Sequence, residues 1–361
     1  QAMRSYLLNA PLEFQNNGIT LPLEIPLPNG KTETFGIMES PILAPEIAAQ
    51  NPDIKTYTGN GLNNKKALIR LSFTSEGFNA ILLNIDGDAV YFEAYSKNAP
   101  NVYFNYFTRD AVSPESKGLV KTCGNATGLL DEHVKKMLDP AFKPESLAPV
   151  VILKTFRLAM AANGEFTAQH GGTQASALAV VVGYVNRMTA LYRNELGVSF
   201  TLVNGTNLMY TNPATDPYNN DDQVAMLDEN LANCDAVIGS ANYDIGHVWG
   251  YIGSSGGGIA AFEAVCDDSR KGQGVSGEGD LSFYAQVFMD QLLFHEVGHQ
   301  FGMSHSYNSV IPVCTTRSAP TSVEPGGGTT IMSYGFTCGT DDYFETNIPF
   351  TGPILQFHAA S

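Results

Sequence analysis

The chain has 361 residues, of which only 16% are charged, and its formal net charge is −16 with a sequence pI near 4.7. This acidic, weakly charged composition argues against nucleic-acid binding, and no apolar run is long enough to span a membrane. The length exceeds that of one typical domain, so we expect two domains with separate cores.

Residues 1–125 are predicted to form a β-rich domain. Short segments such as TLPLEIPL, ALIRLSFTS and AVYFEAYSK alternate β-branched or aromatic residues with polar ones. Such alternation is typical of half-buried strands, and the dipeptides Asn29-Gly30 and Asp86-Gly87 are typical of tight hairpin turns. No cluster of catalytic residue types lies in this half of the chain.

The second half has a different pattern. Residues 126–149 contain three prolines and are predicted to be a linker. From residue 150 to residue 361 we expect an α/β domain, with buried strands at VVILKTFRLAMA and VSFTLV. Between these strands, residues 174–196 have the apolar spacing of a long helix that Gly197 ends. A further helix is expected over NNDDQVAMLDENLAN.

The segment HEVGHQFGMSH, at residues 295–305, has the pattern of a catalytic zinc site. His295 and His299 are four residues apart, so on a helix both imidazoles project from one face. Gly302 is suited to the positive φ that ends a helix and turns the chain, which would bring His305 toward the same metal. Three neutral imidazoles leave a fourth tetrahedral position for water, and Glu296 is placed to act as general base.

This segment resembles the long zinc signature HExxHxxGxxH of the metzincin metallopeptidases, with all five defining positions matched. The stretch TTIMSYG resembles the methionine turn that metzincins carry beneath the metal, with Met332 as hydrophobic support for the histidine rings. The resemblance implies an active-site helix and a twisted mixed sheet. The sequence IMSY resembles the methionine turn of serralysins, and this resemblance makes Tyr334 a candidate transition-state stabiliser. The alternative is that Tyr334 packs under the turn.

Cys123 lies in LVKTCGNATG, which resembles the cysteine-switch peptide of matrix metalloproteinase and adamalysin (reprolysin) propeptides. A thiolate is a strong zinc ligand and would occupy the position that catalysis reserves for water. The resemblance therefore implies that residues 1–125 are an inhibitory prodomain and that Cys123 binds the zinc in a latent form. A buried free cysteine or an additional disulfide partner is the alternative.

The other four cysteines lie in the second half. We expect a disulfide between Cys314 and Cys338, which would staple the loop after the third histidine, and a second between Cys234 and Cys266. Four cysteines permit three pairings, so the other two combinations stay open. Disulfides imply an oxidising compartment, and we expect a secreted, extracellular protein.

The segment GSSGGGIAAFEAVC resembles the adamalysin strand that forms the upper rim of the cleft. The resemblance implies that a protein or peptide substrate binds as an extended strand beside residues 256–262. Calcium is a second candidate ion, because acidic pairs such as Asp221-Asp222, Asp267-Asp268 and Asp341-Asp342 are present; a solvated surface is their alternative.

We therefore expect an α+β chain, a β-rich prodomain followed by a metzincin α/β domain, that functions as a monomeric latent zinc endopeptidase. Two other functions stay open at this point. A zinc-binding adhesion or recognition module on the same scaffold would have no use for the base Glu296. A zinc hydrolase acting on a non-peptide substrate would not need the rim strand.

Overall fold

The computed structural model describes residues 2–15, 17–95, 102–111, 122–124 (backbone only), 152–220, 222–251, 257–279, 286–312, 314, 316–335 and 337–342. The helices are α1 Ala2–Leu7, α2 Pro45–Gln50, α4 Gly164–Gln169, α5 Gln174–Leu196, α6 Gln223–Val237 and α7 Gln286–Gln300. Short 3-10 turns lie at Thr206–Leu208, Ser240–Asn242 and Gly339–Asp341. The expected linker at 126–149 lies outside the described residues, so the domain boundaries stay predictions.

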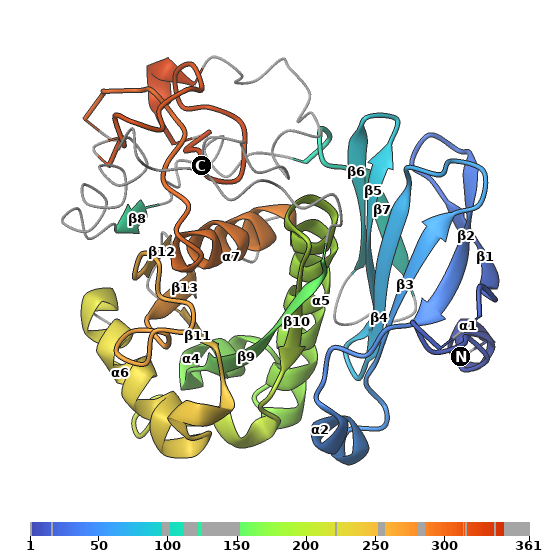
Figure 1. Cartoon of the computed structure of the whole chain (residues 1–361), viewed down its shortest axis with the longest axis horizontal. Coiled ribbons are helices and arrows are strands. Elements are labelled where there is room, and N and C mark those ends of the chain that lie inside the picture. The colour runs from blue at the N-terminus through green and yellow to red at the C-terminus, as the bar shows by residue number, and fades with distance from the viewer. Residues whose placement is uncertain are drawn as a thin grey trace.

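In the described part of the first half, the strands form one antiparallel sheet in chain order. They are β1 Leu21–Pro26, β2 Thr32–Glu39, β3 Lys55–Gly61, β4 Leu68–Thr74, β5 Gly77–Ile85, β6 Asp88–Ala94 and β7 Tyr103–Phe107. Gly30 and Gly87 have φ of 79°, as the tight turns between β1 and β2 and between β5 and β6 require. The β-rich first half is confirmed, and Figure 1 shows this sheet beside the rest of the molecule.

The second half contributes most of a mixed sheet in the order β10-β9-β11-β13-β12-β8. Its strands are β8 Thr122–Gly124, β9 Lys154–Ala162, β10 Val198–Leu202, β11 Ile245–Tyr251, β12 Gly257–Ala260 and β13 Gly274–Glu278. β10, β9, β11 and β13 are parallel, whereas β12 runs antiparallel to β13. The expected α+β class, with a β-rich region followed by an α/β region, is confirmed.

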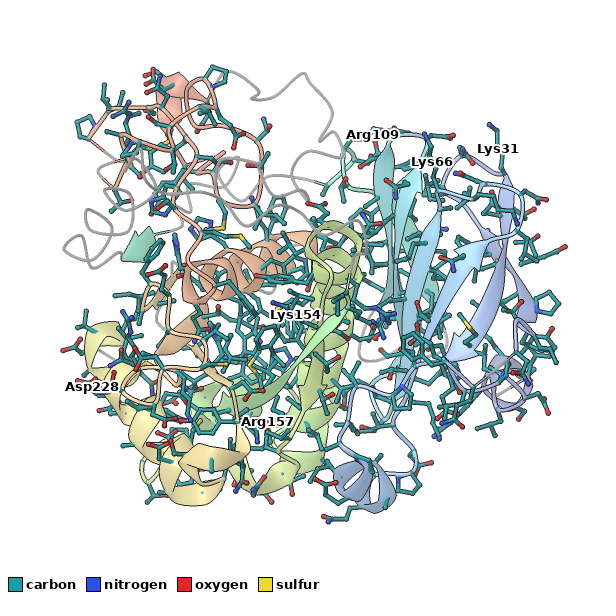
Figure 2. The ribbon with its side chains drawn as sticks, viewed as in Figure 1. Lys31, Lys66, Arg109, Lys154, Arg157 and Asp228 are labelled. Atoms are coloured by element: carbon teal, nitrogen blue, oxygen red, sulfur yellow. A yellow bond between two sulfur atoms is a disulfide. The ribbon has the colours of Figure 1, made fainter. Side chains whose placement is uncertain are left out.

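Helix α5 lies between the two sheets (Figure 1). Thr173 and Ser176 form a capping box at its start, and Gly197 ends it with a φ of 65°. Every residue from Ser176 to Tyr192 is buried except the half-buried Val180. Figure 2 shows side chains filling the space on both sides of this helix.

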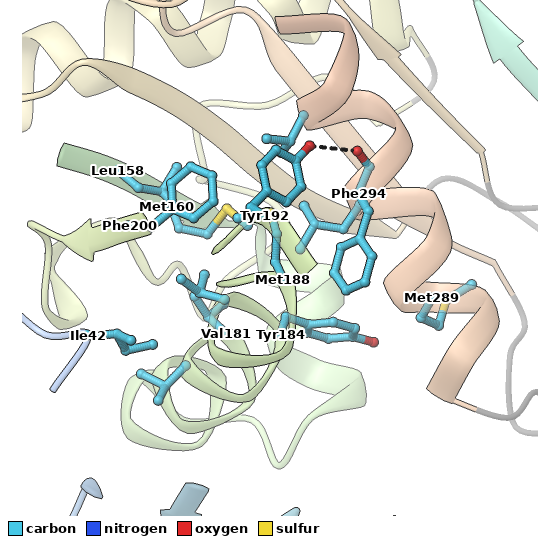
Figure 3. Close-up of a cluster of buried hydrophobic side chains, with 14 of the residues drawn as sticks. Ile42, Leu158, Met160, Val181, Tyr184, Met188, Tyr192, Phe200, Met289 and Phe294 are labelled. Atoms are coloured by element: carbon cyan, nitrogen blue, oxygen red, sulfur yellow. Dashed lines mark hydrogen bonds between the residues drawn. The ribbon is translucent and has the colours of Figure 1, made fainter. Parts of the chain in front are cut away.

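The main hydrophobic core surrounds α5 and joins both halves of the chain. Ile42 from the first half packs in the same cluster as Val181 of α5 and Phe294 of α7 (Figure 3). Tyr91, also from the first half, belongs to this cluster. The first half also has a separate core on the other face of its sheet. The expected separation of cores therefore applies to only one face of the N-terminal sheet.

The C-terminal end of α7 is tied to the mixed sheet by a buried histidine. His247 on β11 contacts Gln300 Oε1 through Nδ1 at 2.9 Å and Ser276 Oγ through Nε2 at 2.9 Å. Because the Gln300 oxygen only accepts, Nδ1 carries the proton, and the Gln300 amide in turn donates to Gly246 O. Among the described helices, none is long and apolar enough to cross a membrane.

The buried His247 makes stability depend on pH. Burial lowers its pKa from 6.5 to about 4, so between these values the unfolded chain binds a proton that the folded chain does not. The unfolding free energy should therefore fall as the pH falls through this window, by about 2 kcal/mol from this group at about pH 5. Urea denaturation of the wild type and His247→Gln at about pH 7.5 and about pH 5 would measure the difference. Equal losses in the two proteins would contradict the prediction.

Candidate metal centre

Helix α7 presents His295 and His299 on one face, four residues apart. All residues of α7 from Val287 to Gln300 are buried, so the helix is fixed by packing around its whole circumference. One of the contacts that position it is polar: the Tyr192 hydroxyl on α5 donates to the carbonyl of Phe294 at 2.8 Å, as Figure 3 shows. The two imidazoles therefore project from a rigid support.

Gly302 ends this helix and returns the chain, as expected from the sequence. Its φ is 89°, its N–H donates to the carbonyl of His299, and the N–H of Met303 donates to the carbonyl of Gly298. These two bonds form a Schellman motif, which needs a left-handed residue at this position. The turn brings His305 back beside the helix.

The three histidines converge through their Nε2 atoms. The separations are 3.0 Å between His295 and His299, 3.1 Å between His299 and His305, and 3.2 Å between His295 and His305. A tetrahedral zinc with bonds of about 2.0–2.1 Å would hold such nitrogens about 3.3 Å apart. The donor set and its spacing therefore fit a zinc ion.

Each of the three rings is oriented by a backbone carbonyl. Nδ1 of His295 contacts Ile331 O at 2.7 Å, that of His299 contacts Met303 O at 2.7 Å, and that of His305 contacts Thr316 O at 2.6 Å. A carbonyl only accepts, so each Nδ1 carries the proton and each Nε2 lone pair points to the common centre. Such outer contacts are typical of histidine ligands to a metal.

Burial keeps these rings in the form that binds a metal. It lowers the pKa of His299 to about 4 and that of His305 well below its usual value. At neutral pH both are neutral imidazoles. Among the described residues, the three histidines form the one group of metal-binding side chains whose ligand atoms converge.

Glu296 lies against strand β12. Its side chain is fully buried, and a Cβ built at Gly258 would approach Glu296 Cγ to 2.5 Å and Oε1 to 2.7 Å. These distances are too short for a side chain, so Gly258 is required for β12 to pass beside the carboxylate. The expected base therefore lies between the histidines and the expected rim strand.

The expected methionine turn lies beneath the histidines. Met332 is fully buried in the main core, and its carbonyl accepts from the N–H of Ser306, next to His305. The preceding carbonyl, of Ile331, is the one that orients His295. The turn therefore contacts both ends of the histidine segment through its backbone.

Glu324 joins the two loops that carry these contacts, and sequence reasoning did not find it. Its buried carboxylate accepts from the Ser306 hydroxyl, from the hydroxyl and N–H of Thr330, and from the N–H of Thr329. No spacing rule points to it, because it lies in a loop 19 residues after His305.

Tyr334 lies beside the histidines and is nearly buried. Its ring centre is 4.8 Å from that of His305 and stacks on Tyr307 at 4.5 Å. Its hydroxyl accepts from Thr316 Oγ1 at 2.8 Å. This position is compatible both with a contact to a bound substrate and with the packing role that was its alternative.

One expected disulfide is present and the other is wrong. Cys314 and Cys338 are bonded, which closes the loop that follows His305. Cys234 and Cys266 are free: Cys234 is fully buried on α6 against β11, whereas Cys266 is exposed in a turn. The two thiols therefore occupy different environments and do not meet.

The backbone of Cys123 lies in β8, the outermost strand of the mixed sheet. β8 runs parallel to β12, and Cys123 is paired with Gly258. The side chain of Cys123 lies outside the described residues.

The described acidic side chains proposed for calcium have other partners. Asp222 caps α6, Asp267 binds Arg270, Asp268 binds Lys271, and Asp341 accepts from Ser309. Asp221 lies outside the described residues. These four carboxylates therefore have partners within the fold.

The turn at Gly302 is predicted to be necessary for metal affinity. In Gly302→Ala, the new methyl group would be strained by the positive φ and would meet Glu263 Cγ at 2.9 Å. We expect a stability loss of at least about 2 kcal/mol and a roughly tenfold weaker zinc affinity, measured by chelator competition. Gly30→Ala is the matched control, because φ there is 79° and nothing lies within 4 Å. It should cost about 1 kcal/mol and leave zinc affinity unchanged; equal affinities in both variants would refute the assignment.

Two solved protein structures are among those similar to this chain. The crystal structure of myroilysin aligns with a TM-score of 0.25 and 12% identity, over 55% of this chain and 60% of that chain. The metalloproteinase-II from Bacteroides fragilis aligns with a TM-score of 0.39 and 12% identity, over 77% of this chain and 79% of that chain. The chain thus spans about 60% of the length of myroilysin. No curated protein sequence matches it.

A family model gives the assignment. The model described as metallo-peptidase family M12B, reprolysin-like, matches residues 152–353, which is more than half of the chain and includes all three histidines. The match agrees with the geometry of the site and with the α/β architecture of the same residues. The chain therefore belongs to the M12B reprolysin-like metallopeptidase family.

Proposed function

We propose that this chain is a secreted zinc endopeptidase in a latent form. The observation that carries the proposal is the convergence of three Nε2 atoms at 3.0–3.2 Å beside a buried glutamate that lies against the rim strand. Three neutral imidazoles with an acidic residue next to the first are what metal-assisted peptide hydrolysis needs.

In the proposed mechanism, His295, His299 and His305 hold the zinc, which supplies Lewis-acid polarisation of the scissile carbonyl. Glu296 takes the proton from the attacking water and delivers it to the leaving amine. Met332 supports the histidine segment from below through its backbone contact to Ser306. Tyr334 is proposed as a stabiliser of the developing oxyanion, since its ring lies beside that of His305.

The substrate is proposed to be a protein or peptide bound in extended form along β12. β12 pairs with β13 on one side, and its other edge is the one that faces β8. A strand at this edge would use the main-chain hydrogen bonds of residues 257–260 and would pass over Glu296 at Gly258. We propose a monomer as the functional unit.

Latency is proposed to come from β8. Its backbone occupies the edge that the substrate would use, and adjacent strands lie about 4.8 Å apart. Because Cys123 pairs with Gly258 and Gly258 abuts Glu296, the backbone of Cys123 is one strand away from the proposed base. This placement supports the proposal that the Cys123 thiolate is the fourth zinc ligand.

Secretion is proposed from the cysteine chemistry. The Cys314–Cys338 bond closes the loop whose Thr316 carbonyl orients His305, so the bond stabilises one of the ligands. A disulfide with that position would be unreliable in a reducing cytosol. An oxidising, extracellular compartment suits it.

The role of Glu296 is tested in the activated enzyme. Glu296→Gln should keep one zinc per chain and lose casein hydrolysis by about 10²- to 10⁴-fold, because the base is gone while the ligands remain. Glu46→Gln, an exposed position on α2, is the control and should match the wild type. Retained casein hydrolysis in Glu296→Gln would sink the mechanism. An activated wild type that binds zinc but cleaves neither casein nor a small ester would favour a binding module, and one that cleaves only the ester would favour a non-peptide hydrolase.

The role of Cys123 is tested in the uncut chain. Cys123→Ser should raise peptidase activity at least roughly tenfold, because a hydroxyl is a poor zinc ligand at neutral pH. A thiol-reactive mercurial should activate the wild type but add little to this variant. Cys266→Ser, which removes an exposed free thiol, is the matched control and should stay latent and mercurial-sensitive. A Cys123→Ser chain as inactive as the wild type, yet activated by proteolysis, would show that the thiol is not the inhibitor.

A further inference from the structure

Between Ser176 and Tyr192, helix α5 has no solvent-facing side. One side packs on β10 and α7 of the peptidase half, and another packs on β4 and β5 of the N-terminal sheet. Its sequence is apolar around nearly the whole circumference, as in AVVVGYV, and a helix of this kind needs cover on all sides. Gly183 allows the close approach, since a Cβ there would lie 3.0 Å from the Asn79 amide on β5.

Strand β5 of the N-terminal sheet likewise needs α5 to cover one of its faces. Ala80 and Leu82 point into the separate core of the N-terminal sheet, whereas Ile81 and Leu83 point into the core shared with α5. Successive side chains of a strand alternate between faces, so both faces of β5 are apolar. Without α5, one apolar face of the sheet would be in water.

A buried ion pair between α5 and α7 is hydrogen-bonded to the N-terminal sheet. Arg187 on α5 binds Asp290 on α7 with distances of 2.7 Å and 3.0 Å, and both side chains are at most 4% exposed. The N-terminal sheet completes the pair: Asn79 Oδ1 accepts from Arg187 at 3.0 Å, and the Tyr91 hydroxyl donates to Asp290 at 2.9 Å. The N-terminal sheet therefore covers this pair and supplies two of its hydrogen bonds, so loss of either bond while the sheet stays in place would leave a buried polar group unsatisfied.

Two further contacts hold the halves together at the other end of α5. Glu13 accepts from both Nη atoms of Arg193, at 2.8 Å and 3.1 Å. Residues 42–44 add a short bridge to the free edge of β10, in which Leu202 N donates to Ile42 O and Ala44 N donates to Leu202 O. The interface therefore combines helix packing, buried charges and sheet extension.

Among the described residues, the proposed inhibitory contact is made by β8. β8 has three residues, and it pairs with three residues of β12. Inhibition and docking are thus made by different segments of the first half, one at the cleft and one behind α5. We propose that the N-terminal sheet region, residues 2–111, is a permanent non-covalent subunit of the mature enzyme, which stays bound to α5 and α7 after cleavages that release β8 from the cleft. This inference rests on the proposed function only in taking β8 as the inhibitory strand.

The test uses the full chain with recognition sites for a sequence-specific protease inserted in residues 112–121 and 126–149. After both cuts, the N-terminal and peptidase fragments should co-elute in gel filtration at a 1:1 ratio, with casein hydrolysis switched on. Separation of the fragments, with a folded, monomeric, zinc-loaded peptidase fragment, would overturn the inference. Co-elution without casein hydrolysis would instead count against the proposed function and leave the subunit assignment standing.

A variant pair locates the interaction. The double variant Asn79→Ala, Tyr91→Phe removes both hydrogen bonds from the N-terminal sheet to the buried ion pair. Exchange of the cut complex with a tagged N-terminal fragment should therefore be at least roughly tenfold faster. Tyr103→Phe is the matched control, because its hydroxyl contacts Phe78 within the same sheet. Equal exchange rates in the double variant and the control would show that these two hydrogen bonds do not hold the subunits together.

Discussion

The orientation of three imidazole rings by three backbone carbonyls is the constraint on which the site depends. Each ring donates Nδ1–H to a carbonyl, which leaves the three Nε2 lone pairs directed at one point. All three of these carbonyls lie after the end of α7 at Gln300, so the turn and the loops that carry them must be fixed as well. Glu324 and the Cys314–Cys338 bond provide that rigidity, and the glycine turn at 302 sets the return path. The positions of the three Nε2 atoms therefore depend on the loops that carry these carbonyls.

The helix that carries two of the histidines is also held in place by a core that the two halves share. Helix α7 carries two of the proposed ligands and packs against α5, and α5 in turn is covered by the N-terminal sheet. The Arg187–Asp290 pair joins the two helices, and both of its members are hydrogen-bonded to that sheet. The apolar surface of α5 is stable only while it is covered. The support for the active-site helix thus extends into the first half of the chain, well away from the cleft.

Much of this arrangement was predictable because it depends on local spacing. The four-residue interval between His295 and His299, the left-handed glycine at 302 and the turns at Gly30 and Gly87 follow from backbone geometry within a few residues. The second disulfide was wrong, since pairing depends on which side of α6 and of its neighbouring turn each thiol faces, and spacing does not encode that. Glu324 was missed for a related reason: its hydrogen bond to Ser306 joins the loop of residues 324–330 to the end of the histidine segment, and the two become neighbours only after folding.

The sequence by itself determined the metal-binding pattern, the glutamate beside it and the change from a β-rich first half to an α/β second half. These features are periodic or contiguous, and short-range sterics decide them. The tertiary structure alone decided that β8 lies beside Gly258, that Cys234 and Cys266 stay apart, and that α5 is enclosed by two sheets. Each of these depends on contacts between segments separated by tens of residues or more, where packing and the burial of apolar surface select the partner.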